Sequence, residues 1–282
     1  MQNVKFIGAS SDLGVNIDGT KLAPNLILKN RKNKILLDQK EDIEKSQDPN
    51  DLRKNLDELN AFNKELYQTI KKEDNFCFMI GGDHSTAIAS GLASLSKHEN
   101  LGLIWIDAHL DYNTFETTIT GNLHGLPLAT LNGLNKDLSK FHEGKYFDPK
   151  KTVVVGYRAF EDNANLEIEN IKTMGVTVYT TNDIKEYGVN KILNQAFKIA
   201  TNNTGGIHIS FDLDVIDPNL VMGVSVPEEN GLNKLELDEV INYLNKNKNV
   251  IKSFDLVEYN PLYDKDNKTL DMTNNIINKL VK

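Results

Sequence analysis

The sequence of 282 residues contains only one cysteine, so no disulfide can form within the chain. Cys77 lies in a short apolar run, where a buried structural role is expected rather than a nucleophilic one. No apolar run approaches the roughly 20 residues that a membrane-spanning helix needs, and the chain begins with a strand-like segment at residues 4–8 instead of a signal-peptide pattern. We therefore expect a soluble, cytoplasmic protein that does not enter membranes.

Basic residues are fewer than acidic ones, 32 against 40, which gives a formal net charge of −8. This balance argues against nucleic acid as a partner, because phosphate backbones are bound through basic surfaces. Hydrophobic residues make up 39% of the chain, enough for a large core. Because no linker rich in proline, glycine or serine divides the sequence, we expect residues 1–282 to form a single catalytic domain.

Strand-like apolar runs alternate with helical patterns along the chain. Between residues 50 and 72, for example, apolar side chains recur in steps of three and four, which is typical of an amphipathic helix. The alternation predicts a parallel sheet with helices on both faces and with ligands at the carboxyl ends of its strands. We predict strands at 4–8, 34–37, 76–80, 101–106, 152–156, 176–180, 206–212 and 250–256, and helices at 24–28, 50–72, 86–95, 123–131, 165–174, 190–200, 236–244 and 267–281.

Three potential metal ligands follow the apolar run at residues 103–106. Asp107, His109 and Asp111 stand at alternate positions. Side chains two residues apart share one face of an extended chain, so all three can converge at one strand end.

Two other strand ends repeat this arrangement. Asp212 and Asp214 end a strand about a hundred residues later, and His84 follows a glycine turn after a third strand. Each feature alone has an ordinary explanation, since aspartate often caps helices and a Gly-Gly-Asp turn is common. Together they favour a metal site, because four carboxylates at one sheet edge would repel one another unless a cation held them.

The charges in this set suggest two metal ions. Four aspartates and two neutral imidazoles balance two divalent cations, and a mixture of oxygen and nitrogen ligands suits manganese, with iron, cobalt, nickel and zinc as competitors. Two ions about 3.5 to 4 Å apart share a bridging hydroxide, which is a nucleophile at neutral pH. The chemistry indicated by the residues is therefore hydrolysis.

Five segments of the chain carry a family resemblance. In order and spacing they resemble the arginase branch of the ureohydrolase family, and the resemblance covers nearly the whole chain. It implies a three-layer α/β/α domain with an eight-stranded parallel sheet, usually assembled into homo-oligomers that are trimers or hexamers. The segments are Gly-Gly-Asp-His-Ser at 81–85, Asp-Ala-His-Leu-Asp at 107–111, Thr-Gly-Asn-Leu-His-Gly-Leu-Pro at 120–127, Ser-Phe-Asp-Leu-Asp-Val-Ile-Asp-Pro at 210–218, and Leu-Val-Glu-Tyr-Asn-Pro at 256–261.

The resemblance assigns ligands to two Mn²⁺ ions. Asp107 and Asp212 would bridge the two ions. The remaining ligands would be His84 and Asp111 on one ion, and His109 and Asp214 on the other.

The resemblance also implies catalytic roles. Glu258 would bind the planar guanidinium through two parallel N–H bonds. Taken alone, a glutamate after a strand is more often a surface or loop residue, but the matching Glu-Tyr-Asn-Pro context reverses that preference. His124 would transfer a proton to the departing amine, as its unperturbed pKa permits; the alternative is a histidine that makes a packing hydrogen bond. Asp111 would accept a hydrogen bond from the nucleophile.

Recognition of the amino-acid end of the substrate is implied by three further positions. Asn113 and Thr120 match loop positions that bind the α-carboxylate, with threonine in place of the usual serine. Glu161 stands where the family commonly has an aspartate near the α-amino group. The longer side chain of Glu161 would require the loop to retreat.

The segment 223–231 departs from the family pattern. Arginases typically carry Gly-Thr-Gly-Thr-Pro-Val-Val-Gly-Gly here, whereas this chain has Gly-Val-Ser-Val-Pro-Glu-Glu-Asn-Gly, so Val226 replaces a threonine hydroxyl. Glu228 and Glu229 add negative charge that would suit a cationic substrate or simply a solvated loop. The Ser-Val-Pro sequence at 225–227 is also similar to formimidoylglutamase sequences.

Together with the resemblance, these residues imply a manganese-dependent hydrolase that converts L-arginine to L-ornithine and urea. Other ureohydrolases are the alternatives, namely an agmatinase, a guanidinobutyrase or a formimidoylglutamase. A non-catalytic metal-binding homologue is a further alternative, although such proteins usually lose ligands first and this chain keeps all six.

Overall fold

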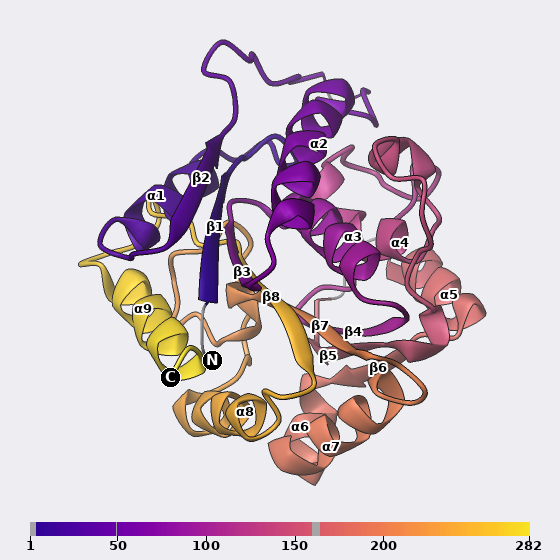
Figure 1. The fold of residues 1–282 in the computed structure, drawn as a ribbon, viewed down its shortest axis with the longest axis vertical. Coiled ribbons are helices and arrows are strands. Elements are labelled where there is room, and N and C mark those ends of the chain that lie inside the picture. Colours follow the sequence, from indigo (N-terminus) through magenta and orange to yellow (C-terminus); the bar gives the residue numbers. More distant parts are fainter. Residues whose placement is uncertain (1–3, 49, 160–163) are drawn as a thin grey trace.

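The computed structural model describes residues 4–48, 50–159 and 164–282, and the strands within these ranges form one sheet of eight parallel strands (Figure 1). The strand order is β2-β1-β3-β8-β7-β4-β5-β6. This confirms the predicted parallel sheet. The strands are β1 (Val4–Ser10), β2 (Lys34–Asp38), β3 (Phe76–Gly81), β4 (Leu101–Ile106), β5 (Thr152–Tyr157), β6 (Thr177–Thr180), β7 (Gly206–Asp212) and β8 (Ile251–Val257).

Helices cover both faces of the sheet, and together the layers give the predicted α/β/α arrangement (Figure 1). One face packs against α2 (Leu56–Lys72), α3 (Ala87–Lys97), α4 (Pro127–Leu131) and α5 (Ala164–Met174). The other packs against α1 (Ala23–Leu28), α6 (Thr181–Tyr187), α7 (Val189–Ala200), α8 (Lys234–Lys246) and α9 (Lys268–Leu280). Among the described residues, no helix combines the length and apolar character needed to cross a membrane.

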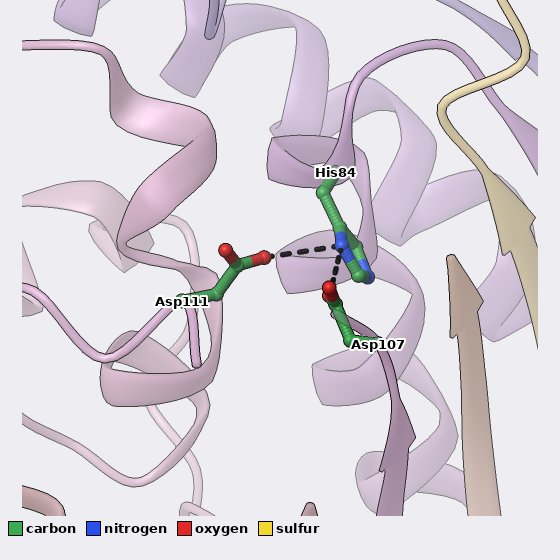
Figure 2. Close-up of side chains that lie close together, drawn as sticks. All are labelled: His84, Asp107 and Asp111. Carbon is green, nitrogen blue, oxygen red and sulfur yellow. Dashed lines mark ion pairs between the residues drawn. The ribbon is translucent and has the colours of Figure 1, made fainter. Parts of the chain in front are cut away.

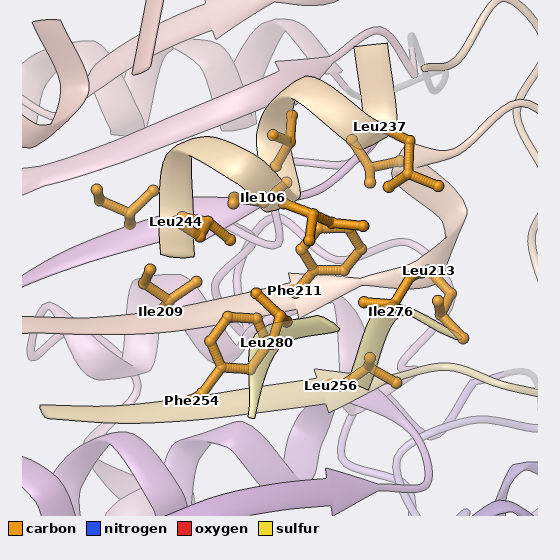
Figure 3. Packing of buried hydrophobic residues seen from close by; sticks show 14 of the residues in the cluster. Ile106, Ile209, Phe211, Leu213, Leu237, Leu244, Phe254, Leu256, Ile276 and Leu280 are labelled. Atoms are coloured by element: carbon orange, nitrogen blue, oxygen red, sulfur yellow. The ribbon is translucent and has the colours of Figure 1, made fainter. Parts of the chain in front are cut away.

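Alternation along the central strands divides the core into two clusters. In β4, Ile104 and Ile106 enter the cluster under α7 and α8, whereas Leu103 and Trp105 enter the cluster under α2 and α3. Strands buried on both faces therefore read as continuous apolar runs, as expected for a parallel sheet. Figure 3 shows the first cluster, in which side chains from β4, β7 and β8 meet those of α8 and α9.

Helix α2 begins later than the periodicity predicts. The predicted helix started at residue 50, whereas the observed one starts at Leu56. The preceding Asn55 has a left-handed backbone with φ of 55°, and its side chain accepts from the Ser46 amide and donates to the Leu13 carbonyl. These contacts with distant loops hold Asn55 outside the helix, so the predicted start was wrong by six residues.

A fully buried polar network joins β7, β8 and α3. The His208 ring lies between Asp255 Oδ2, 2.9 Å from Nε2, and Ser253 Oγ, 2.7 Å from Nδ1. The hydroxyl of Ser90 donates to Asp255 Oδ1, and the hydroxyls of Ser94 and Ser253 are hydrogen-bonded. Because these groups satisfy one another, the network fixes α3 against the sheet without leaving a buried charge unpaired.

Candidate metal centre and active-site cavity

The candidate ligands lie at the ends of three strands, β3, β7 and β4, and β8, which lies between β3 and β7 in the sheet, leads to Glu258. The turn after β3 requires glycine at Gly82, because a Cβ there would lie 1.9 Å from the Ser11 carbonyl oxygen. Asp83 then caps the following short helix by accepting from the Ser85 amide. The turn places His84 over the adjacent strand ends.

His84 faces three carboxylates. Its Nδ1 lies 3.1 Å from Asp107 Oδ2, 3.1 Å from Asp111 Oδ2 and 3.0 Å from Asp212 Oδ2. Figure 2 shows the first two of these side chains pointing toward the His84 ring. Neither His84 Nδ1 nor Asp107 Oδ2 makes a hydrogen bond within the described chain, although both are buried. Polar atoms buried in this way are costly unless another group satisfies them.

His109 forms a second cluster that shares Asp107 with the first. His109 Nδ1 lies 2.9 Å from Asp214 Oδ2 and 3.6 Å from Asp107 Oδ1. Asp212 lies beside His84. Within the described residues, two groups of side chains could hold an ion: His84 with Asp107 and Asp111, and His109 with Asp107 and Asp214. The six predicted ligands thus lie together at one edge of the sheet.

Backbone amides orient three of the carboxylates. Asp107 Oδ1 accepts from the His109 amide at 2.7 Å, Asp212 Oδ1 from the Asp214 amide at 2.8 Å, and Asp214 Oδ1 from the Ala108 amide at 3.2 Å. Each carboxylate is therefore held through one oxygen and presents the other to a histidine. This arrangement preorganises the oxygens before any ion binds.

The pKa values report an excess of negative charge. Burial, reinforced by the Asp107 charge, raises the pKa of Asp111 to about 6, and burial also raises the pKa values of Asp212 and Asp214. Burial opposes the charged form of His84, but its three carboxylate neighbours hold its pKa well above the ordinary value. The unsatisfied buried atoms and the mixed oxygen and nitrogen donors fit divalent cations that bring in the missing positive charge.

Two further predicted residues meet beside the metal ligands. His124 Nδ1 lies 3.1 Å from Glu258 Oε1, and the same oxygen accepts from the His84 amide at 2.8 Å. Glu258 has φ of 66°, and its own amide donates to the Gly82 carbonyl. Burial lowers the pKa of His124, but the hydrogen bond and charge of Glu258 outweigh it and raise the pKa to about 9.

A cavity of about 200 Å³ opens next to this group and adjoins a smaller one of about 50 Å³ that reaches His84 and Glu258. The wall of the larger cavity includes Asn113 and Thr120, which the sequence analysis predicted as substrate contacts. Val226 borders both cavities. Glu161 lies outside the described residues. The cavity is large enough for a small elongated molecule with one end near the carboxylate cluster.

Sequence reasoning missed several cavity residues. Thr118, Asn122 and Glu167 line it, and Asn122 Oδ1 is buried without a hydrogen-bond partner in the described chain. Glu167 on α5 is buried and accepts from the Tyr112 amide at 2.7 Å. Asn122 belongs to the segment 120–127, which carries the family resemblance, so it could have been predicted as a cavity residue from the sequence. Glu167 had no sequence signal beyond membership of a helix.

Known proteins are similar to this chain in sequence and in fold. A model of the Arginase family matches residues 2–282. An arginase of Bacillus subtilis strain 168 is 37% identical over 222 residues, 77% of this chain and 73% of that protein. An arginase of Bacillus caldovelox is 31% identical over 288 residues, 95% of this chain and 94% of that protein. The solved structure of Entamoeba histolytica arginase in complex with L-ornithine superposes with a TM-score of 0.89 at 27% identity and covers 99% of this chain and 98% of that one.

Proposed function

Because this chain belongs to the arginase family, we propose that it hydrolyses the guanidinium group of L-arginine to L-ornithine and urea at a centre of two Mn²⁺ ions. The convergence of two histidines and four aspartates beside a cavity that contains His124 carries this proposal. Enzymes of the arginase family hydrolyse linear amidines, and they use a binuclear metal centre. The whole chain would act as one catalytic domain.

The ions would be held by two overlapping ligand sets. His84 and Asp111 would bind one ion, His109 and Asp214 the other, and Asp107 and Asp212 both. The contacts that Asp107 makes with both histidines support its bridging role. Two divalent ions bound together lower the pKa of water enough to supply a hydroxide nucleophile near neutral pH.

The chain's own residues would fix the guanidinium and deliver the proton. Glu258 reaches the smaller cavity, where its carboxylate would accept N–H bonds from the cationic group. His124 is hydrogen-bonded to Glu258, whose charge favours the protonated imidazole and raises the pKa of His124, so a proton is present there for the departing amine. Asp111 lines both cavities and would accept a hydrogen bond from the attacking group.

The wider end of the cavity would recognise the amino acid. Asn113 and Thr120 line its wall and would donate hydrogen bonds to an α-carboxylate. Glu161 remains a proposed neighbour of the α-amino group. Glu167 contributes a carboxylate to the wall of the larger cavity. A free carboxylate on the substrate would distinguish arginine from agmatine.

Val226 supports a second candidate function. Its side chain borders both cavities at the position where arginases typically carry a threonine hydroxyl. A missing hydroxyl at the rim would alter substrate choice within the family. Agmatine, guanidinobutyrate and formimidoylglutamate are therefore the competing substrates.

The decisive experiment is release of urea from manganese-loaded protein given L-arginine or agmatine at equal concentration. We expect strong preference for arginine. A preference for agmatine would contradict the assignment of Asn113 and Thr120, and turnover of formimidoylglutamate alone would transfer the function to that class. Absence of turnover on the whole panel would support the non-catalytic alternative.

We also propose that the protein is a cytoplasmic homo-oligomer, a trimer or a hexamer. The net charge of −8 and the lone cysteine are in keeping with this setting. Analytical ultracentrifugation of the manganese-loaded protein would measure the assembly, and a monomer at micromolar concentration would refute this part of the proposal.

A further inference from the structure

The two histidines of the metal centre have different partners on their far ring nitrogens. His84 Nε2 lies 2.9 Å from the Ser210 hydroxyl, and the ring stacks on Trp105 with centroids 4.0 Å apart and planes 6° apart. His109 Nε2 is buried and has no hydrogen-bond partner in the described chain. One histidine is thus anchored, and the other presents an unsatisfied nitrogen.

Glu228 is the charged group that faces this nitrogen. Its Oε1 lies 3.8 Å from His109 Nε2, with 15% of the histidine side chain and 35% of the glutamate side chain exposed. This separation is within ion-pair range but longer than a hydrogen bond. A shift of the partly exposed Glu228 carboxylate by about 1 Å would bring Oε1 within hydrogen-bond distance of His109 Nε2.

The backbone that carries Glu228 is held firmly. Arg158 Nη2 donates to the Glu228 carbonyl at 2.8 Å and to the Asp214 carbonyl at 2.6 Å, and Arg158 Nε donates to the Glu229 carbonyl at 2.9 Å. Gly231 completes the packing, since a Cβ there would lie 2.7 Å from Arg158 Nη2. One guanidinium therefore ties the loop at 228–229 to the turn that carries the carboxylate partner of His109.

We propose that Glu228 is a positioning residue that accepts a hydrogen bond from His109 Nε2–H and so holds Nδ1 toward the second metal ion. This inference rests on the proposed two-metal function. A neutral imidazole that ligates through Nδ1 must carry its proton on Nε2, and a buried N–H needs an acceptor. Carboxylates that orient ligating histidines in this way commonly change metal affinity by about 10- to 100-fold.

The test is a titration of metal-free protein with Mn²⁺, in which electron paramagnetic resonance counts the free ion. Wild type should bind two ions. E228V, which removes the acceptor, should weaken the second binding step by about 10- to 100-fold. E228Q keeps an oxygen acceptor without the charge and should recover most of that loss. E229V and E229Q make the same changes at the exposed neighbouring residue and should bind as wild type does.

Each other outcome would overturn the inference. Unchanged second-site affinity in E228V would refute it while leaving the proposed function intact, provided wild type binds two ions and releases urea from arginine. Equal losses in E228Q and E228V would assign the effect to charge rather than to an accepted hydrogen bond. If E228V does not fold, as judged by circular dichroism, E228A removes the same acceptor with a smaller side chain and should show the same loss of about 10- to 100-fold. Unchanged second-site affinity in E228A would refute the inference. A wild type that binds fewer than two ions would refute both proposals.

Discussion

Glu258 and His124 are 134 residues apart in the sequence, and their side chains are in contact, with Oε1 3.1 Å from Nδ1. The same carboxylate oxygen receives the amide of His84. One glutamate therefore links the proposed proton donor to the turn that presents a proposed metal ligand. A substitution of Glu258 should therefore affect both His124 and the turn that carries His84.

Replacing His124 should slow the chemical step and leave the metal centre intact. We expect H124N to lower kcat by about 100- to 10,000-fold, the range for a lost general acid, with manganese content unchanged. Steady-state urea assays and elemental analysis measure the two quantities. H142N is the matched control, because His142 is bonded to the Lys145 carbonyl and lies outside the cavity lining. A fully active H124N would remove His124 from the mechanism.

Removing the charge of Glu258 should lower the pKa of His124. In the metal-free protein this pKa is raised to about 9 from its ordinary 6.5. A raised pKa stabilises the folded state fully below about pH 6.5, and the contribution disappears as the pH rises through about 9. E258Q should therefore bring the NMR titration of the His124 ring below that of wild type, and should flatten the loss of stability between these pH values. Coincident titration curves would contradict the pairing.

Removing Asp214 should cost one ion. D214A loses the carboxylate that faces His109, so we expect one bound Mn²⁺ instead of two and a loss of activity at least as large as the roughly 100-fold seen for outer-shell partners. Circular dichroism should show a folded chain. D217A is the control, because the Asp217 carboxylate is bonded to Asn219 rather than to a proposed ligand. Full activity of D214A at limiting manganese would refute the two-ion assignment.

The hydroxyl of Thr120 should matter for arginine and not for agmatine. Loss of a hydrogen bond to a charged carboxylate typically costs about 10- to 100-fold in binding. We expect T120V to lower kcat/KM for arginine by that factor while the smaller activity on agmatine stays unchanged. T114V removes a hydroxyl from the same loop outside the cavity lining and should behave as wild type. Equal losses on both substrates would show that Thr120 supports the loop instead.

The buried network under the sheet should contribute strongly to stability. D255A would leave His208 and Ser90 without their acceptor, and breaking a buried pair of this kind typically costs about 3 to 5 kcal/mol. Urea denaturation followed by circular dichroism measures the free energy of unfolding. D271A, at an exposed aspartate of α9, should change it by no more than about 0.5 kcal/mol. A loss in D255A as small as that of D271A would show that the network is dispensable.

The strands and the family were accessible from the sequence because their signals are local. An apolar run such as residues 101–106 carries its strand signal within the segment itself, and the predicted parallel sheet is confirmed. The alternation of Asp107, His109 and Asp111 follows from the geometry of one extended segment. The predicted ligand roles themselves stay predictions, although the structure brings the residues together.

Only the tertiary structure decided which loops meet. The sequence alone determined a parallel α/β sheet with carboxylates and imidazoles at its strand ends. The left-handed Asn55, the cavity position of Glu167 and the approach of Glu228 to His109 all depend on contacts between segments far apart in the chain. The periodicity of apolar residues indicates how a segment packs against the core, but it does not indicate which loop of the chain will contact that segment. Asp212 and Asp214 could be singled out from the sequence because they stand at the end of an apolar run, whereas the proximity of Glu228 to His109 depends on the fold, in which Arg158 holds the Glu228 backbone.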